Sequence, residues 1–448
     1  MLLKFEFENY KCFAKNTVFS MQPADKQRDI EYSVCREKIK GIRKEIKAVC
    51  SSVIYGANAS GKTNIISAMC TFKSIILRGN IRNEKIVSNP NNPSSSKLEL
   101  IPNFYSDSPK PVHFSIEFIT DNMKVGYEIS IDVGTFLNIN YDRKVVFERL
   151  VVNDVEIYSR NNNEVTFNDN LPASLRKFIR KFDKQQENIF TSSISLKKDE
   201  LFLNNGFRII FAPDLTEIIT HWLEEKLIII CGFDKTRMIP MFPEDNNTKL
   251  HEMYTSKSLN QALEQLGVNS SKVGFISEKE GSIPKLFSEI KIKNTKIQIQ
   301  SDIFESLGTT RFVDLFPMIL GGLCNGATIV IDEFDASIHP MALLSIINIF
   351  HNDEINTRHA QLIFNTHNPV FLNGNVFRRD EIKFVERNDE TSIIYSLSDF
   401  QTSGINGVRK GEDYMKHYFI NKYGAINDID FSQIFEDAMK NSVKKQEK

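Results

Sequence analysis

The sequence predicts an α/β fold in which a doubly wound, mainly parallel sheet carries an antiparallel β lobe and a helical insertion. Three observations support it. An apolar strand, a glycine-bounded loop and an amphipathic helix follow one another in residues 48–76. Strands alternate with helices from about residue 305 to 396, an order typical of parallel sheets. Short period-two segments between residues 111 and 168 are typical of antiparallel strands.

Composition places the chain among ordinary soluble globular proteins. Apolar residues make up 41% and charged residues 25% of the 448, and 56 basic residues against 57 acidic ones give a net charge of −1. No global basic field therefore favours nucleic acid, although a local patch is compatible with this balance. The six cysteines form no CxxC pair, which argues against a zinc site or disulfide framework and suits a reducing cytosol.

The opening residues, MLLKFEFENYKCF, alternate apolar and polar side chains and predict an edge or hairpin strand. They lack the charge-then-apolar order of a signal peptide, and no apolar stretch reaches the ~20 residues of a membrane span. We therefore expect a cytoplasmic protein without a membrane segment.

Residues 171 to about 270 are predicted to be mostly helical, with Leu175, Phe178 and Phe182 on one apolar face. The opposite face of that helix is basic. A solvated face is the simpler interpretation, and a nucleic-acid or partner surface is the alternative. The basic residues are Arg176, Lys177, Arg180, Lys181 and Lys184.

The stretch GANASGKT, residues 56–63, matches the phosphate-loop pattern G-x-x-x-x-G-K-[ST], with a strand before it and a helix after it. Gly56 and Gly61 allow the backbone to turn its N–H groups inward around a β-phosphate at the helix N-terminus. Lys62 bridges the β- and γ-phosphates, and Thr63 offers a hydroxyl to Mg²⁺. The flanking strand and helix argue against a chance glycine turn. The predicted nucleotide-binding set is completed by Ala57, Asn58, Ala59, Ser60 and Asn64.

Two adjacent acids, Asp332 and Glu333, end the apolar run 327–331. A phosphate loop needs an acid at the end of a neighbouring strand to hold Mg²⁺ through water, which predicts Asp332 as a metal ligand beside Thr63. A carboxylate one residue further on can orient or deprotonate the attacking water, which predicts Glu333 as catalytic. His367 follows the next strand and can contact a γ-phosphate; a strand-capping or core histidine is the alternative.

Four segments, GANASGKT, ESLGTTR, IVIDEFD with SIHP, and FNTHN, stand in an order that resembles the ABC-class ATPases, the group of SMC, RecF and OLD-type proteins. More closely, the chain resembles the stand-alone AAA-type ATP-binding proteins of bacterial abortive-infection and anti-phage systems, such as the RloA/AbiL and PARIS ATPases. The resemblance spans nearly the whole chain, from FENYKCF through FERL to DEIKFVERN. It implies a P-loop NTPase of ABC/SMC-head type that uses ATP and Mg²⁺.

The resemblance also implies roles for single residues. Residues 56–63 become Walker A, with Lys62 among the catalytic groups, Asp332 and Glu333 become Walker B, and His367 becomes the switch histidine. Ser306 and Gly308 lie in the signature segment, which in this class caps the γ-phosphate bound to another subunit; a plain helix cap is the alternative. The resemblance therefore implies a homodimer or higher homo-oligomer with ATP between the heads.

Asp335 falls in the D-loop region and, with the SIHP turn, is predicted to face the other head, whereas His339 is predicted to be structural. The signature departs from LSGGQ, and no long heptad repeat indicates an SMC-type arm. The Q-loop glutamine stays unassigned between Gln185 and Gln186.

The same resemblance divides the chain into four parts. Residues 1–110 are the first half of the ATPase head with Walker A, and 111–170 are the antiparallel lobe. Residues 171–284 are the helical insertion, and 285–448 are the second half of the head with the signature, Walker B and the switch histidine.

These observations favour an ATP-hydrolysing sensor or scaffold of an anti-phage system that controls a separate effector, expected to be a nuclease. The residues after His367 are too few for the Toprim nuclease of OLD-type proteins, so we expect the effector to be a partner chain. The alternative is a RecF/SMC-like DNA-repair ATPase that binds DNA directly. A third alternative is a binding module whose nucleotide site is purely structural.

Overall fold

The computed structural model describes the chain except for residues 26, 28, 29, 83–97, 106–108, 137, 139, 140, 181–195, 232–251, 278–283, 403–406, 410, 428, 447 and 448. Several predictions from the sequence fall in these gaps. The basic residues Lys181 and Lys184, the apolar Phe182 and both Q-loop candidates, Gln185 and Gln186, lie outside the described residues.

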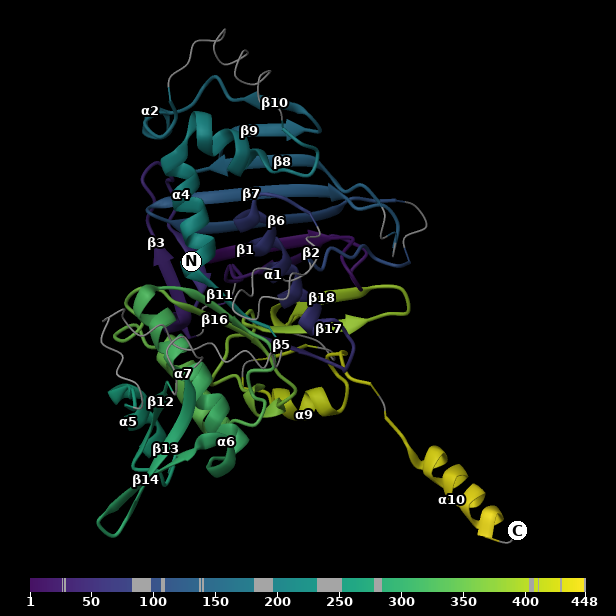
Figure 1. Cartoon of the computed structure of the whole chain (residues 1–448). Coiled ribbons are helices and arrows are strands. Elements are labelled where there is room, and N and C mark those ends of the chain that lie inside the picture. Colours follow the sequence, from purple (N-terminus) through teal and green to yellow (C-terminus); the bar gives the residue numbers. More distant parts are fainter. Residues whose placement is uncertain are drawn as a thin grey trace.

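The centre of the molecule is a six-stranded sheet in the order β11–β15–β16–β5–β17–β18 (Figure 1). The first five strands run parallel, and only the edge strand β18 is antiparallel. Together with the helices on its two faces, this confirms the predicted mainly parallel, doubly wound sheet. The strands are β11 (Leu227–Ile230), β15 (Thr328–Ile331), β16 (Gln361–Asn365), β5 (Ser51–Gly56), β17 (Ile382–Arg387) and β18 (Ser392–Ser396).

Both faces of the parallel sheet are buried, which is why its strands are nearly continuous apolar runs. Alternate side chains of β15 and β16 enter two different apolar cores: Val330 and Ile363 point to one, and Ile329 and Phe364 point to the other. Period-two packing of this kind fixes the register, because a slip of one residue would exchange the two faces.

A second, antiparallel sheet of seven strands covers the first core in the order β10–β9–β8–β7–β6–β1–β2. The prediction that the opening strand is a hairpin strand is confirmed by its pairing with β2, but it is not an edge strand, because it also pairs with β6. Its alternating side chains are consistent with either position, so the sequence does not distinguish them. The strands are β1 (Leu2–Glu8), β2 (Thr17–Ser20), β6 (Val112–Thr120), β7 (Met123–Asp132), β8 (Lys144–Val152), β9 (Val155–Asn161) and β10 (Glu164–Phe167).

The helix α1 (Lys62–Arg78) packs in the core shared by the two sheets. Its predicted apolar face is confirmed, since Ile65, Met69, Phe72 and Ile76 are all buried. A fully buried glutamine, Gln361, joins the sheets nearby. Its side-chain oxygen accepts hydrogen bonds from the Leu2 N–H (2.6 Å) and the Thr328 hydroxyl (2.9 Å). Its side-chain nitrogen donates hydrogen bonds to the carbonyls of Leu2 (3.0 Å) and Val49 (3.1 Å).

Helices cover the other face of the parallel sheet (Figure 1). The longest, α7, is long and apolar enough by length and composition to cross a membrane, yet Phe312, Val313, Leu315 and Ile319 are buried in the second core. We therefore assign α7 as a core helix. These helices are α6 (Ser301–Phe304), α7 (Leu307–Asn325), α8 (Pro340–Phe350), η5 (Pro369–Phe371), η6 (Leu397–Asp399) and α9 (Tyr414–Phe419); α10 (Ser432–Gln446) follows them.

The segment predicted as mostly helical also contains two strands that the sequence did not predict. The apolar run of β11 completes the parallel sheet beside β15, and β12 (Lys272–Ile276) forms a small sheet with β13 (Lys285–Ile292) and β14 (Thr295–Gln300). Four-residue apolar runs do not separate strand from helix by periodicity, and tertiary pairing decides. The helical elements are α2 (Ala173–Arg176), η3 (Leu203–Phe211), α4 (Pro213–His221), η4 (Trp222–Lys226) and α5 (Lys257–Gln265).

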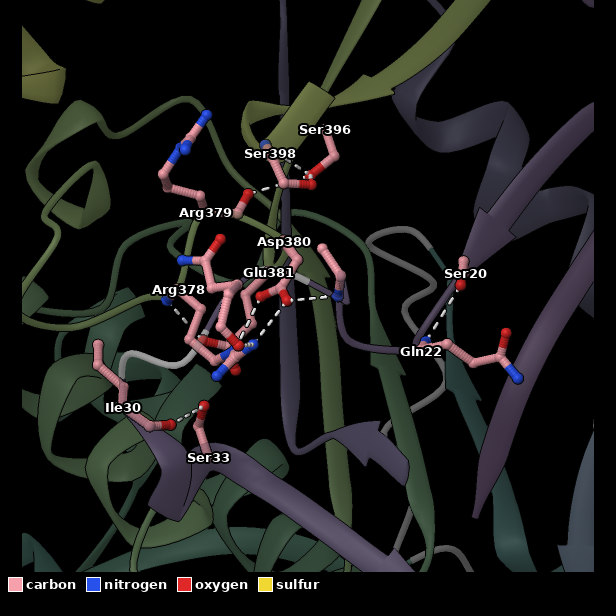
Figure 2. Close-up of polar contacts among 12 residues, drawn as sticks. Ser20, Gln22, Ile30, Ser33, Arg378, Arg379, Asp380, Glu381, Ser396 and Ser398 are labelled. Carbon is pink, nitrogen blue, oxygen red and sulfur yellow. Dashed lines mark hydrogen bonds and ion pairs between the residues drawn. The ribbon is translucent and has the colours of Figure 1, made fainter. Parts of the chain in front are cut away.

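A polar cluster closes the edge of the parallel sheet at the amino end of β17 (Figure 2). The Arg378 guanidinium donates two hydrogen bonds to the Asp380 carboxylate (2.9 and 2.8 Å), and Asp380 also accepts from the Ala24 N–H (2.8 Å). These charged groups are buried and paired, and through Ala24 they hold the segment that follows β2. That segment leads through the short helix η1 (Glu31–Ser33) to β3 (Val34–Glu37), which pairs with β4 (Ile46–Val49).

A buried carboxylate anchors η3 on the antiparallel sheet. Glu148 accepts hydrogen bonds from the N–H groups of Phe202 and Leu203 (2.8 Å each) at the start of that helix, and from the hydroxyls of Tyr127 and Tyr158 (2.8 and 2.9 Å). Arg160, also fully buried, provides the countercharge at 3.4 Å. A carboxylate at a helix N-terminus is stabilised by the exposed N–H groups there.

Replacing Glu148 with Gln should lower the free energy of unfolding by about 3–5 kcal/mol, because it leaves the Arg160 charge buried without its partner. Denaturant unfolding monitored by circular dichroism measures the change. The matched control is Glu128→Gln, which breaks the half-exposed pair with Arg149 and should cost ~1 kcal/mol or less. Equal losses in the two variants would contradict the anchoring role of Glu148.

Candidate functional site

The predicted phosphate loop connects β5 to α1 at the carboxyl edge of the parallel sheet. Gly56 admits no side chain, because a Cβ there would collide with the Val385 carbonyl oxygen. Gly61 has φ +113°, and a Cβ would lie 2.6 Å from Cys12 Sγ. Both glycines are therefore required by close packing, and Gly61 also by its left-handed backbone.

Lys62 is buried and bends back over this loop. Its Nζ donates hydrogen bonds to the carbonyls of Gly56 (2.8 Å) and Ala57 (2.9 Å). Burial lowers the pKa of Lys62 to about 8, although the charges of Asp332 and Glu333 act in the opposite direction. A polyanion beside Nζ would restore the fully charged form, which suits a group that binds phosphate.

Asp332 lies directly after β15, where it meets side chains from the end of β16 and from the start of α1. Its Oδ1 accepts a hydrogen bond from the Thr63 hydroxyl (3.0 Å), and it also accepts one from the side-chain amide of Asn365, the last residue of β16. The carboxylate is buried and held by two donors. The structure thus brings together the predicted metal ligands Thr63 and Asp332.

Glu333 occupies a strained but exposed position directly after Asp332. Its φ is +51°, in the left-handed region that non-glycine residues seldom adopt. Its N–H donates to Asn365 Oδ1 (2.5 Å), and its carbonyl accepts from the Arg311 guanidinium (2.7 Å). The backbone of Glu333 is therefore held on both sides, while the residue itself is exposed.

His367 follows β16 at the same edge and is exposed. Partial desolvation, and next the positive charge of Lys62, lower the pKa of His367, while Asp335, Glu333 and Asp332 raise it. His367 comes two residues after Asn365, whose side chain bonds both Asp332 and the Glu333 N–H, so the three predicted residues lie at one edge of the sheet. A mostly neutral imidazole at neutral pH can accept or donate a hydrogen bond there.

The signature segment lies against the turn that follows Glu333. Ser306 caps α7, accepting a hydrogen bond from the Thr309 N–H (3.1 Å), so the helix-cap interpretation is confirmed. Gly308 packs so closely on the Ser337 carbonyl that a Cβ would collide with it. Asp335 is half-buried in this turn. His339 caps α8, because its Nδ1 accepts a hydrogen bond from the Met341 N–H (3.2 Å), which agrees with the structural role predicted for His339.

Two residues of the site were not predicted from the sequence. Asn365 bonds both Asp332 and Glu333, and Arg311 joins the signature helix to the Glu333 carbonyl. Asn365 is the polar residue that ends the apolar run Leu362–Phe364, and this position in the sequence could have indicated its role. No comparable signal indicates Arg311, because an arginine on a helix is usually solvated.

A buried serine, histidine and glutamate also meet, at the amino end of the sheet. Ser51 Oγ lies 2.7 Å from His351 Nε2, and Glu381 Oε1 lies 3.3 Å from the same nitrogen. A hydrolytic triad needs the carboxylate on the other ring nitrogen and an accessible serine. Since all three residues are buried, this cluster is structural.

The donor set at the carboxyl edge fits a hydrated magnesium ion. Mg²⁺ usually takes one or two side-chain oxygens together with phosphates and water, and Thr63 Oγ1 and Asp332 Oδ1 lie 3.0 Å apart. Among the described residues no cluster of three metal-binding side chains exists, so a closed protein site of the zinc type is not formed there. A cavity of about 350 Å³ adjoins the phosphate loop, between residues 57–60, 385–389 and 425–427.

For the ATPase activity proposed below, replacing Asn365 with Ala should lower kcat at least tenfold with a smaller change in ATP affinity, because it frees Asp332 and Glu333 from their positions. Phosphate release and fluorescent-ATP titration measure the two quantities. Asn352→Ala, which removes an exposed turn contact, is the control. Wild-type kcat in the Asn365 variant would show that the amide does not position these acids.

The chain is similar in structure to the SMC head domain from Thermotoga maritima, at 12% sequence identity and a TM-score of 0.35, covering 88% of this chain and 98% of that one. No curated protein matches the sequence.

A family model described as "AAA domain, putative AbiEii toxin, Type IV TA system" matches residues 51–373. The match contains the phosphate loop, the signature segment, both Walker B acids and His367. With its mainly parallel sheet, its phosphate loop and its antiparallel sheet, the protein has the α/β architecture that the sequence predicted. Because the match covers well over half of its length, the chain belongs to this family of AAA-type ATPase domains.

Proposed function

We propose that the protein binds and hydrolyses ATP as the sensor or scaffold of a bacterial anti-phage system of the abortive-infection type. ATP would bring two heads together, and the dimer would control a separate cytoplasmic effector, a nuclease. The observation that carries the ATPase part is the joint placement of Thr63, Asp332, Glu333 and His367 at one edge of the sheet.

Each side chain of the site has a distinct task in this proposal. Lys62 and the N–H groups of the phosphate loop bind and orient the β- and γ-phosphates. Thr63 and Asp332 would hold Mg²⁺, which would neutralise phosphate charge. Glu333 orients the attacking water and takes its proton at the carboxylate, while Asn365 fixes the backbone that carries Glu333. His367 contacts the γ-phosphate side of the site.

Exposed apolar side chains support dimerisation through this same edge. Leu307 (66% exposed) follows the signature serine, Met341 (64%) follows the SIHP turn, and Val370 (46%) follows His367. Ile303 and Phe304 are exposed beside the signature as well. Large exposed apolar groups around a polar site are typical of an interaction surface. Ser306 and the N-terminus of α7 would then meet the γ-phosphate of the second head.

The family description supports the assignment to defence, since it names a toxin of a toxin–antitoxin system. In this proposal the effector is a separate chain.

The variant Glu333→Gln should bind ATP with near wild-type affinity, lose hydrolysis at least a hundredfold, and accumulate as a dimer, because ATP stays between the heads. Light scattering with and without ATP–Mg²⁺ measures the dimer. Lys62→Ala, which should lose ATP binding, is the paired control.

In cells, both variants should lose phage protection. Full protection by both would contradict the ATPase proposal, and an ATP-bound monomer would contradict the dimer.

A second candidate function, DNA binding by a RecF/SMC-like ATPase, is favoured by one observation. The hairpin β13–β14 has Lys291 opposite Lys296 on one exposed face, with Lys293 in its turn. DNA affinity that falls steeply with salt, and falls again in Lys291→Glu/Lys296→Glu, would support this candidate. The exposed lysines Lys38, Lys40 and Lys44 between β3 and β4, changed to Glu, provide the control. Binding unaffected by the hairpin variant would exclude this surface.

A further inference from the structure

The last described part of the chain is a helical arm with an uncovered apolar face. We use the term C-terminal arm for residues 429–446, which include α10. Figure 1 shows α10 standing clear of both sheets, joined to the body by an extended segment. The large apolar residues at its beginning are almost as exposed as in an isolated helix: Ile429 63%, Phe431 60%, Ile434 64% and Phe435 69%.

The spacing of these residues makes the arm amphipathic. Phe431, Ile434 and Phe435 are separated by three and four positions, so they lie on one side of the helix. Gln433 and Asp437 lie on the other side and are exposed. A helix that is apolar on one side is stable when that side packs against another apolar surface. The described residues of one chain leave these side chains more than half exposed.

A second uncovered apolar surface lies on α9. Met415 (37% exposed) and Phe419 (60%) are four residues apart on one side of that helix, and Ile420 (65%) follows them. We call these three residues the α9 patch. Tyr414 and Tyr418 of the same helix are buried in the second core.

The position of the α9 patch connects it to the nucleotide edge. The helix α9 packs against η5, which begins two residues after His367 and carries the exposed Val370. The helix that carries the α9 patch therefore packs on an element that we proposed above as part of the dimer face. A surface next to a dimer face is within reach of an arm from the second copy.

We propose that the C-terminal arm of one copy packs its apolar side on the α9 patch of a second copy, so that the two chains exchange arms across the dimer. The inference rests on the dimer of the proposed function and names a part of its interface. In a two-fold dimer each chain both gives and receives an arm, which covers both apolar surfaces at once. One chain alone leaves both of them exposed.

The area that the arms and patches would cover is a large part of what a stable interface needs. Each chain contributes three exposed phenylalanine rings, Phe419, Phe431 and Phe435. A fully buried aromatic residue covers about 150–250 Å². Scaled by their exposure, the six rings of two copies supply roughly 600–900 Å², and the exposed isoleucines add to it. Stable interfaces bury about 1,200–2,000 Å² in total, so the arms would supply a large share.

The test uses the full chain with ATP–Mg²⁺ and two variants of the arm. Phe431→Ser/Phe435→Ser removes the apolar side, and Gln433→Ser/Asp437→Ser alters the polar side of the same turns as the matched control. Sedimentation equilibrium should show a dimer dissociation constant raised at least tenfold in the first variant and unchanged in the second. Fluorescent-ATP binding by the monomer should be unchanged in both, because the arm lies outside the phosphate loop.

The contact itself is located by photocrosslinking. Benzoylphenylalanine replaces Phe431 in one preparation of the chain. This preparation is mixed with a second, isotopically labelled preparation that keeps Phe431 and carries no benzoylphenylalanine. Mass spectrometry should find mixed-isotope crosslinks from position 431 to residues 414–420. Crosslinks within one chain only would show that the arm folds back on its own α9 and would overturn the proposal. A wild-type dimer constant in Phe431→Ser/Phe435→Ser would also overturn it. Loss of ATP binding in the wild type would instead overturn the proposed function.

Discussion

The site depends on one buried carboxylate, that of Asp332. A charged group at the end of an apolar strand is costly to desolvate unless donors or a cation surround it. Here the Thr63 hydroxyl from α1 and the Asn365 amide from β16 provide the donors. The same contacts set the distance between the phosphate loop and the strand that carries Asp332 and Glu333. The carboxylate therefore organises three elements that are far apart in the chain.

The rest of the fold holds these three elements in register. The helix α1 lies in the core shared by the parallel and antiparallel sheets, so a shift of either sheet would move Thr63. Gln361, at the start of β16, joins β1 to the parallel sheet, while Asn365 at the end of the same strand bonds the two acids. The strand β16 therefore links the contact between the two sheets to the positions of the two acids. Such support keeps a catalytic group near its working position.

Local patterns predicted the parallel sheet, the lobe of β6 to β9 and the phosphate loop, because each has a period or a motif tied to backbone geometry. Asp332, Glu333 and His367 were predicted because they end apolar strands, and the structure places them together. Asn365 and Arg311 were missed, since their roles come from neighbours that only the tertiary structure brings close. The strand β11 and the internal position of β1 were missed for a related reason: pairing partners distant in sequence decide them.

The most direct test of the account is the binding of a metal ion at Asp332. Mn²⁺ replaces Mg²⁺ in oxygen-rich sites and is visible by electron paramagnetic resonance. In a titration of the full chain with ATP, we expect tight, ATP-dependent Mn²⁺ binding that weakens at least tenfold in Asp332→Ala while ATP itself still binds. Unchanged Mn²⁺ affinity in Asp332→Ala would contradict the central role of this carboxylate.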